Sequence, residues 1–311
     1  MSIIQIVRSF IVKVIRRSTR GLIRLLNRLL KFSDKRVSGF SRIPVTTLNQ
    51  EKLVISASKY NMFAASGEDY YSEQYWQIIE EYLPSPTDEV KILDLGSGQG
   101  RMVQKILDNF PCAEIRCCDI SSKAIRALQI NTSTSETQKV MATVSNYDDY
   151  LREQSSSSFD IVLFTEVSFY SPGWEESLPE IQRVLRPGGV FVSSHRSRYF
   201  NAMVLLSLGH VLEAKQTLGS NSGRLFGTTE LQFSWNDSSA ICAILKETGF
   251  SNVKAAGIGV LSGIKGDPHE FLAEPGKLSG DERIALMELE KKLGETVPDA
   301  GRYVLFIATK E

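Results

Sequence analysis

Short apolar segments alternate with segments of helical periodicity along most of this chain. The apolar residues 90–93 are followed by residues 101–107, in which apolar side chains recur every three or four positions. Further strands are predicted at residues 114–119, 139–144, 158–164, 184–192 and 302–308, and further helices at residues 73–83, 123–130 and around 245–250. Strands that alternate with helices are typical of an α/β domain built on a largely parallel sheet.

The helix predicted at residues 73–83 has clear boundary signals. Ser72 is placed to cap its first turn, and Pro84 ends it because proline cannot continue a helix. Its large apolar side chains are expected to pack in the core, and they are Tyr75, Trp76, Ile79 and Leu83.

Three glycines at alternate positions connect the first predicted strand to its helix. The chain from Asp94 to Gly100 is Asp-Leu-Gly-Ser-Gly-Gln-Gly. Glycine lets the backbone turn tightly and brings a ligand against bare main chain, because no Cβ stands in the way. The helix that follows begins with unpaired N–H groups and the positive end of its dipole. This arrangement indicates a turn that binds a nucleoside-containing ligand.

The spacing of these glycines narrows the class of ligand. The dinucleotide fingerprint is G-x-G-x-x-G, and the phosphate loop of nucleotide triphosphatases needs a lysine after its last glycine, whereas none follows Gly100. The D-x-G-x-G-x-G pattern instead resembles motif I of the class I S-adenosylmethionine-dependent methyltransferases. This cofactor has no phosphates, and its ammonium group can be paired with an acid such as Asp94.

Other motifs support the same resemblance from about Tyr70 onward. Asp119 ends the second predicted strand, nineteen residues after Gly100, where a carboxylate can accept both ribose hydroxyls. Residues 184–192 match the family's LRPGG turn into its fifth strand, and residues 245–250 resemble its helix ending in aGF. The resemblance implies a Rossmann-like seven-stranded sheet flanked by helices, with the last strand antiparallel.

The resemblance also implies a set of cofactor-binding residues at the carboxyl ends of four strands. They are Asp94, Gly96, Ser97, Gly98 and Gly100 in the turn, Asp119 and Ile120 after the second strand, Asn146, Tyr147 and Asp148 after the third, and Thr165 after the fourth. In the family, an acidic or amide residue after the third strand reads the adenine amino group, and Asn146 and Asp148 are the alternatives here. Tyr70 and Tyr71 either reach this site from a segment that closes over it or pack in the core.

Two insertions are expected outside the common core. Residues 196–235 follow the fifth strand on the ligand side of an open α/β sheet, and we expect them to form a substrate lid. Their section from Tyr199 to Leu212 is apolar nearly all round, which indicates a helix buried on several sides or one that covers a pocket. Residues 260–300 form the second insertion, with a polar stretch followed by a charged helix from about 281 to 294.

Methyl transfer requires alignment of the acceptor nucleophile, and an oxygen nucleophile also requires a base. The candidate catalytic residues are His195, at the end of the fifth strand, and Glu166, at the end of the fourth. The alternative for His195 is a structural role, as a hydrogen-bonded histidine in a loop. Three arginines flank the lid and either hold an anionic acceptor or lie on the solvated surface; they are Arg196, Arg198 and Arg224.

The segment after the fourth strand bears on the acceptor. Methyltransferases that act on nucleic-acid amino groups carry N/D-P-P-Y there, whereas residues 165–168 are Thr-Glu-Val-Ser. We therefore expect S-adenosylmethionine as the cofactor, a small-molecule or lipid-like acceptor, and no nucleic-acid partner. The alternatives are an aminopropyl transferase on the same scaffold and a catalytically silent, membrane-associated cofactor-binding adaptor.

Cysteine and histidine usage argues against a metal site. The four cysteines form no C-x-x-C pair, and only three histidines are present. Cys117 and Cys118 are neighbours on one predicted strand, so their side chains are expected to pack on opposite faces. No apolar run approaches the ~18 residues that a membrane-spanning helix needs.

A formal net charge of zero conceals a strong asymmetry between the start of the chain and the rest. Residues 1–42 hold eleven Lys and Arg and one acid, Asp34. Within residues 1–31, apolar positions recur at helical spacing and basic ones gather on the other side, which is typical of a segment lying on anionic membrane. The alternatives are an organelle transit peptide, packing on the acidic body or on a partner subunit, and nucleic-acid binding.

The predicted organisation therefore has two parts. Residues 1–45 form a basic amphipathic helical extension, and residues 46–311 form the methyltransferase domain, in which residues 46–88 are a helical cap. We expect a cytoplasmic protein that contacts membrane peripherally through residues 1–31, with organelle targeting as the alternative.

Overall fold

The computed structural model describes residues 67–85, 89–132, 139–224, 232–264 and 267–311. All of them belong to the unit that spans residues 47–311. The predicted helical extension at residues 1–45 lies outside the described residues, as does the first part of the predicted cap, residues 46–66. None of the described helices is long and apolar enough to cross a membrane.

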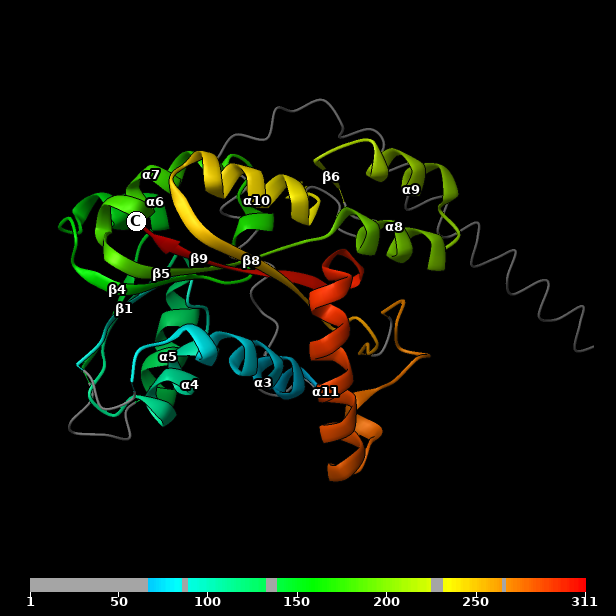
Figure 1. Ribbon diagram of the computed structural model, residues 1–311, viewed down its shortest axis with the longest axis horizontal. Coiled ribbons are helices and arrows are strands. Elements are labelled where there is room, and N and C mark those ends of the chain that lie inside the picture. The colour runs from blue at the N-terminus through cyan, green and yellow to red at the C-terminus, as the bar shows by residue number, and fades with distance from the viewer. Residues whose placement is uncertain (1–66, 86–88, 133–138, 225–231, 265–266) are drawn as a thin grey trace, which may run out of the picture. The chain divides into compact units, whose positions relative to one another are not determined.

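Seven strands form one sheet in the order β3-β2-β1-β4-β5-β9-β8 (Figure 1). The first five run parallel, and β9 is antiparallel to both of its neighbours, β5 and β8. The predicted Rossmann-like sheet with an antiparallel last strand is therefore confirmed. The strands are β1 (Lys91–Leu95), β2 (Glu114–Asp119), β3 (Lys139–Val144), β4 (Phe159–Phe164), β5 (Leu185–His195), β8 (Phe250–Ile258) and β9 (Tyr303–Lys310).

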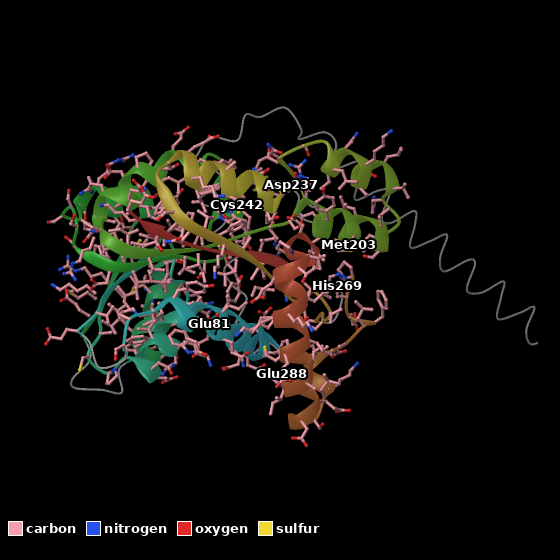
Figure 2. The ribbon with its side chains drawn as sticks, viewed as in Figure 1. Glu81, Met203, Asp237, Cys242, His269 and Glu288 are labelled. Carbon is pink, nitrogen blue, oxygen red and sulfur yellow. The ribbon has the colours of Figure 1, made fainter. Side chains whose placement is uncertain are left out.

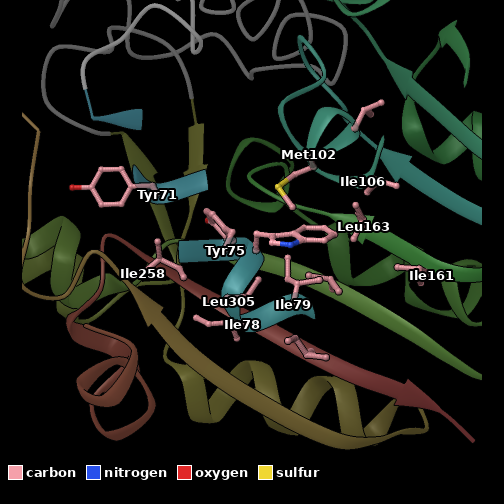
Figure 3. Close-up of a cluster of buried hydrophobic side chains, with 14 of the residues drawn as sticks. Tyr71, Tyr75, Ile78, Ile79, Met102, Ile106, Ile161, Leu163, Ile258 and Leu305 are labelled. Carbon is pink, nitrogen blue, oxygen red and sulfur yellow. The ribbon is translucent and has the colours of Figure 1, made fainter. Parts of the chain in front are cut away.

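Helices cover both faces of this sheet, because alternate strand residues are apolar on both sides (Figure 1). One face carries α3 (Glu68–Ile79), α4 (Arg101–Asn109) and α5 (Ser122–Thr132), and the other carries α6 (Tyr147–Glu153), α7 (Leu178–Val184) and α10 (Ser238–Glu247). Figure 3 shows the core on the α3 side, where Tyr75 and Ile79 lie with Leu163 and Leu305 of the sheet. Cys117 belongs to this core and Cys118 to the opposite one, as their neighbouring positions predict.

The helix at the end of the cap begins earlier than its sequence signals predict. α3 starts at Glu68 after Gly67, whose φ is 90°, so the prediction of Ser72 as the N-cap is wrong. The Ser72 hydroxyl instead donates to the carbonyl oxygen of Glu68, 3.0 Å away, a bond that a serine inside a helix can make. The helix ends at Ile79 and continues as the 3₁₀ turn η1 (Glu80–Tyr82).

The insertion after β5 folds as two short helices and a small hairpin. They are α8 (Arg198–Ser207), α9 (Val211–Leu218), β6 (Ser222–Arg224) and β7 (Gln232–Ser234). The expected apolar helix from Tyr199 to Leu212 is divided between α8 and α9, because Gly209 adopts φ 82° and interrupts it. The two helices share only a small apolar contact, and several large side chains remain exposed: Tyr199, Leu206, Leu208, Val211, Leu212 and Leu218.

The insertion before β9 ends in α11 (Gly280–Thr296), the charged helix that the sequence predicts. Ser279 and Glu282 form a capping box at its start. The segment ahead of it contains His269, whose ring contacts Phe200 of α8 edge-on with the ring centroids 5.4 Å apart. Because Phe200 belongs to α8, the two insertions meet at this contact; Figure 2 labels His269. The other 3₁₀ turns are η2 (Ser168–Tyr170), η3 (Trp174–Ser177), η4 (Pro275–Lys277) and η5 (Pro298–Ala300).

Candidate active site

The glycine turn between β1 and α4 is held by backbone hydrogen bonds to the neighbouring strand. The N–H groups of Gly96 and Ser97 both donate to the carbonyl oxygen of Cys118, at 2.8 and 2.9 Å. Gly96, Gly98 and Gly100 all have positive φ, at 74°, 54° and 89°. These values favour glycine because a Cβ would be strained there. The turn is therefore shaped by the protein itself and presents its main chain at the carboxyl end of β1.

The three glycines differ in what surrounds them. A Cβ at Gly96 would overlap the side chain of Val167, and one at Gly100 would lie 2.9 Å from Leu128. A Cβ at Gly98 would meet nothing within 4 Å. Gly96 and Gly100 are thus needed for packing, whereas the space beside Gly98 is open.

Asp119, at the end of β2, holds the turn from the other side. Its Oδ2 accepts the Gly98 N–H at 2.9 Å, and its Oδ1 accepts the Ser121 N–H at 2.7 Å. Burial raises the pKa of this carboxyl, and the two N–H donors act in the opposite direction. Each oxygen has a second lone pair, so the carboxylate can accept further hydrogen bonds. Ile120 follows it, half-buried.

Asp94 lies inside the site with an unpaired oxygen. Its side chain is 2% exposed, and Oδ2 has no hydrogen-bond partner among the described residues. Burial and then the nearby charge of Asp119 raise the pKa of Asp94 to about 7, against the opposing charge of Arg101. Buried polar atoms without a partner are rare in folded proteins. This oxygen is suited to a cationic ligand group.

A buried network of charges surrounds Arg101, the first residue of α4. Arg101 pairs with Glu166 through Nη2 and with Glu68 through Nη1, the latter at 3.5 Å. Glu68 also pairs with Arg302 at 3.3 Å, and Arg302 with Asp267 at 3.5 Å. Sequence reasoning missed this network. Two members carry a local signal: Glu166 follows the fourth strand, and Arg101 directly follows Gly100 at the start of a helix.

Glu166, the second candidate catalytic residue, occupies an unusual backbone position just after β4. Its φ is 60°, in the left-handed region, and its N–H donates to the Ser194 hydroxyl at 2.7 Å. Burial alone would raise the pKa of Glu166, but Arg101 outweighs it and the net shift is downward. The structure therefore brings Glu166 into the site as a carboxylate held by Arg101.

Aromatic side chains enclose the same region. The Arg101 guanidinium lies 5.7 Å from the centre of the Tyr75 ring, and Tyr303 and Phe169 stack with their centroids 5.7 Å apart. Tyr70 and Tyr71 are fully buried and bind the second insertion instead. The Tyr70 hydroxyl donates to Glu290 at 2.7 Å. Tyr70 therefore packs in the core, which is the second of the two alternatives that the sequence left open for it.

Comparison with known proteins agrees with this geometry. Residues 86–238 match the family model described as "Methyltransferase domain". The chain therefore contains a methyltransferase domain of the S-adenosylmethionine-dependent type. A solved structure of an S-adenosylmethionine-dependent methyltransferase from Listeria monocytogenes has the same fold, with a TM-score of 0.52 and 16% identity over 77% of this chain and 98% of that one.

Two curated methyltransferases illustrate the range of acceptors among its relatives. A tRNA N(3)-cytidine methyltransferase of Bos taurus is 25% identical over 160 residues, which is 50% of this chain and 42% of the relative. A malonyl-[acyl-carrier protein] O-methyltransferase of a Paenibacillus species is 22% identical over 149 residues, which is 48% and 54% of the two chains. The chain therefore spans about half the length of the curated relatives it matches.

In this methyltransferase, the residues after β3 are engaged in local structure. The Asn146 side chain accepts the Asp148 N–H at 2.9 Å and caps α6, and the Asp148 carboxylate accepts the Ser177 hydroxyl. Tyr147 is buried against Phe164, with ring centroids 5.0 Å apart. Each of the two alternatives for adenine recognition, Asn146 and Asp148, therefore already has a side-chain oxygen in a local hydrogen bond. Thr165 is buried at the end of β4.

The structure does not bring His195 into the site. Its side chain is 3% exposed, and its Nε2 lies 3.0 Å from the Ser193 hydroxyl oxygen. The ring packs against Trp174 and Phe306, which belong to the core on the face opposite α3. Burial lowers the pKa of His195 to about 3, so the imidazole is neutral at ordinary pH. This position does not support the predicted role as a catalytic base.

Of the three arginines near the insertion at residues 196–235, two have described side chains, and these two differ in their partners. Arg198 pairs with Asp237 at 2.6 Å and donates to the Leu218 carbonyl oxygen at 3.1 Å, which ties α8 to the end of α9 and to the residue before α10. Arg196 lies over the Tyr303 ring, 4.5 Å from its centre. The side chain of Arg224 lies outside the described residues.

Proposed function

We propose that this chain binds S-adenosylmethionine at the glycine turn and transfers its methyl group to a small-molecule or lipid-like acceptor. One observation carries the proposal: the unpartnered Oδ2 of Asp94 lies in the turn whose central glycine, Gly98, has open space beside it. A buried carboxylate beside bare backbone suits a ligand that carries both a cation and a flat nucleoside.

Each part of the cofactor has a matching group in this chain. Asp94 would pair with the ammonium, and Asp119 would accept the ribose hydroxyls with the lone pairs that Gly98 and Ser121 leave free. The start of α4, with Arg101, would lie near the methionine carboxylate. The donors and acceptors present therefore fit the cofactor.

The chemistry would rest mainly on alignment. The bound cofactor supplies a methyl group activated by its sulfonium, and the protein holds the acceptor in line with it. Glu166 is the candidate base in this proposal, because it lies beside Arg101 at the start of α4. Its lowered pKa makes it a weak base, because Arg101 stabilises the carboxylate. Glu166 is thus suited to accepting a hydrogen bond from the acceptor nucleophile.

The lid helices support an apolar or lipid-like acceptor. Val211 and Leu212 at the start of α9 are 62% and 74% exposed, and Leu206 and Leu208 precede them at 51% and 52%. Neighbouring exposed apolar side chains are typical of a surface that binds something apolar. A tRNA acceptor is the second candidate, and it is favoured by the 25% identity to a tRNA N(3)-cytidine methyltransferase.

One experiment separates these functions. The full-length protein is incubated with methyl-labelled S-adenosylmethionine and, in parallel, with cell lipids, soluble metabolites or total tRNA, and the label is located by mass spectrometry. Label in the lipid or metabolite fraction supports the proposal. Label in tRNA would show that the acceptor is tRNA and not a small molecule or lipid. Calorimetry with S-adenosylmethionine and its decarboxylated form tests the aminopropyl alternative, which predicts preference for the latter. Cofactor binding without label in any fraction would favour the silent adaptor.

A further inference from the structure

We propose that Arg196 forms an anion subsite, so that the acceptor carries a carboxylate or phosphate group next to the position of methyl transfer. This inference rests on the proposed function and names the substrate class of the same site. It makes Arg196 a specificity-determining residue rather than a catalytic one.

Aromatic rings hold Arg196 in place without neutralising it. The carbon of its guanidinium lies 4.5 Å from the centre of the Tyr303 ring, 5.1 Å from that of Phe169 and 6.0 Å from that of Phe200. These rings come from β9, η2 and α8, so three separate elements fix one side chain. Cation–π contact orients a guanidinium but leaves its N–H groups available to an acceptor.

The surrounding arginines form ion pairs with carboxylates, and Arg196 lies only within longer electrostatic range of Glu166. Arg101 pairs with Glu166, Arg302 with Glu68, and Arg198 with Asp237. Within the described part of the chain, Arg196 makes no ion pair. Among the described residues its side chain makes one hydrogen bond, a long one from Nη2 to the Tyr303 hydroxyl at 3.4 Å, and its Nε is buried without an acceptor. A buried donor left unpaired in a folded protein calls for a missing acceptor.

The position of Arg196 agrees with an acceptor-binding role. It follows directly on His195, the last residue of β5, and β5 pairs with β4, whose end leads into Glu166. Ligands of open α/β sheets lie outside the carboxyl ends of such strands. Glu166 does not oppose an anion here, because Arg101 neutralises it.

The chemistry of the guanidinium defines the ligand. Nε and a terminal nitrogen form a planar fork that binds two oxygens of a carboxylate or phosphate together. A neutral acceptor would leave the buried Nε unpaired. The observations therefore favour an anionic acceptor over a neutral one.

The test measures anion binding by the full-length protein, with and without S-adenosylhomocysteine. Acetate and inorganic phosphate are titrated by calorimetry at constant ionic strength, against chloride as reference. Wild type is compared with Arg196→Gln, Arg196→Lys and the control Arg126→Gln, which changes an exposed arginine on α5. We expect saturable binding to wild type and Arg126→Gln, at least tenfold weaker binding to Arg196→Gln, and an intermediate value for Arg196→Lys. The anion that binds more tightly identifies the acceptor group.

The outcomes distinguish this inference from the proposed function. Equal anion affinity in wild type and Arg196→Gln, or no saturable binding to wild type above chloride, would overturn the anion subsite. Failure of S-adenosylhomocysteine to bind would instead overturn the proposed function. Thermal unfolding of each variant is measured beside the titrations, and Arg196→Lys keeps the charge if Arg196→Gln does not fold.

Discussion

The carboxyl groups of Asp94 and Asp119 influence one another across the glycine turn. The pKa of Asp94 is raised to about 7. Burial of its carboxyl group is the larger cause, and the nearby charge of Asp119 is the second. The unfolded chain would ionise Asp94 near its ordinary value of 3.8. The ligand-free protein therefore holds this proton more tightly than the unfolded chain does.

This relationship predicts a specific dependence of stability on pH. Asp94 contributes stability below pH 4, and the contribution is lost as pH rises through about 7, because the folded state then holds a buried charge. Asp94→Asn should raise the free energy of unfolding of the ligand-free protein at pH 8, by up to about 4 kcal/mol. The gain should be smaller at pH 5, and cofactor affinity should fall at least tenfold. Urea unfolding at both pH values measures this, and an equal gain at both would contradict the raised pKa.

Asp119→Ala should lower affinity for the cofactor by about 2–4 kcal/mol, or roughly thirty- to a thousand-fold. Part of the loss would come from the turn, because Asp119 also accepts the N–H groups of Gly98 and Ser121. Asp119→Asn retains one acceptor and should lose less. A cofactor analogue without the ribose 2′-hydroxyl should bind wild type less well and Asp119→Ala unchanged. If the analogue loses affinity equally in both, Asp119 does not bind the ribose.

Gly98 and Gly96 should respond differently to alanine. Gly98→Ala adds a methyl group to open space and strains a backbone with φ 54°, so the free energy of unfolding should fall by about 1–2 kcal/mol. Cofactor affinity should fall more, because the methyl group occupies the ligand's approach. Gly96→Ala should mainly destabilise the fold, because its methyl group overlaps Val167. Thermal unfolding and calorimetry on both variants check this, and full cofactor affinity in Gly98→Ala would refute it.

His195→Ala should act on stability rather than on proton transfer. Removal of the ring leaves a cavity beside Trp174 and Phe306, with an expected loss of about 2–4 kcal/mol. The pH–rate profile of wild type should show no inflection from His195, since its pKa is about 3. Glu166→Gln should lower turnover while the protein stays folded. A stable His195→Ala with lowered turnover would restore His195 as a catalytic residue.

Residues 1–45 should direct the protein to anionic membrane, as their charge and periodicity predict. Sedimentation with anionic and neutral vesicles compares the full chain with a form that begins at Thr46, whose folding is checked by circular dichroism. Binding should require the first 45 residues and weaken as salt rises, because exposed charges are screened. If neither form sediments with anionic vesicles, packing or targeting explains this segment better. Cofactor affinity should be the same in both forms.

The parts of the fold that were predicted from sequence carry local signals. β2 and β3 have the bounds that the sequence predicts, residues 114–119 and 139–144. The glycine turn was equally readable, because positive φ and missing side chains leave glycine in the sequence itself. The apolar section from Tyr199 to Leu212 is less decisive, since it predicts a helix buried on several sides as well as one that covers a pocket, and the structure divides it into α8 and α9. Gly209 was the overlooked signal, because a glycine can end a helix.

Other features depend on residues that are remote in sequence. Glu68 and Arg302 form an ion pair at 3.3 Å from positions more than two hundred residues apart, and neither position carries a motif. His195 was placed at the ligand edge by its position in β5, but alternation along the strand points it to the opposite core. Strand register, not residue type, decided its role.

Glu290 of α11 receives four hydrogen bonds, from the Tyr70 hydroxyl, the Gln74 amide, the Ser262 hydroxyl and the backbone of Leu261. Through Tyr70 and Gln74 it fastens α11 to α3, whose first residue, Glu68, is paired with Arg101 at the glycine turn. A continuous set of polar contacts therefore links α11 through α3 to Arg101 at the ligand site. A molecule that displaced α11 would therefore change the affinity of the site beside Arg101 for its ligand. By thermodynamic reciprocity, that ligand would change the affinity for the first molecule by the same factor.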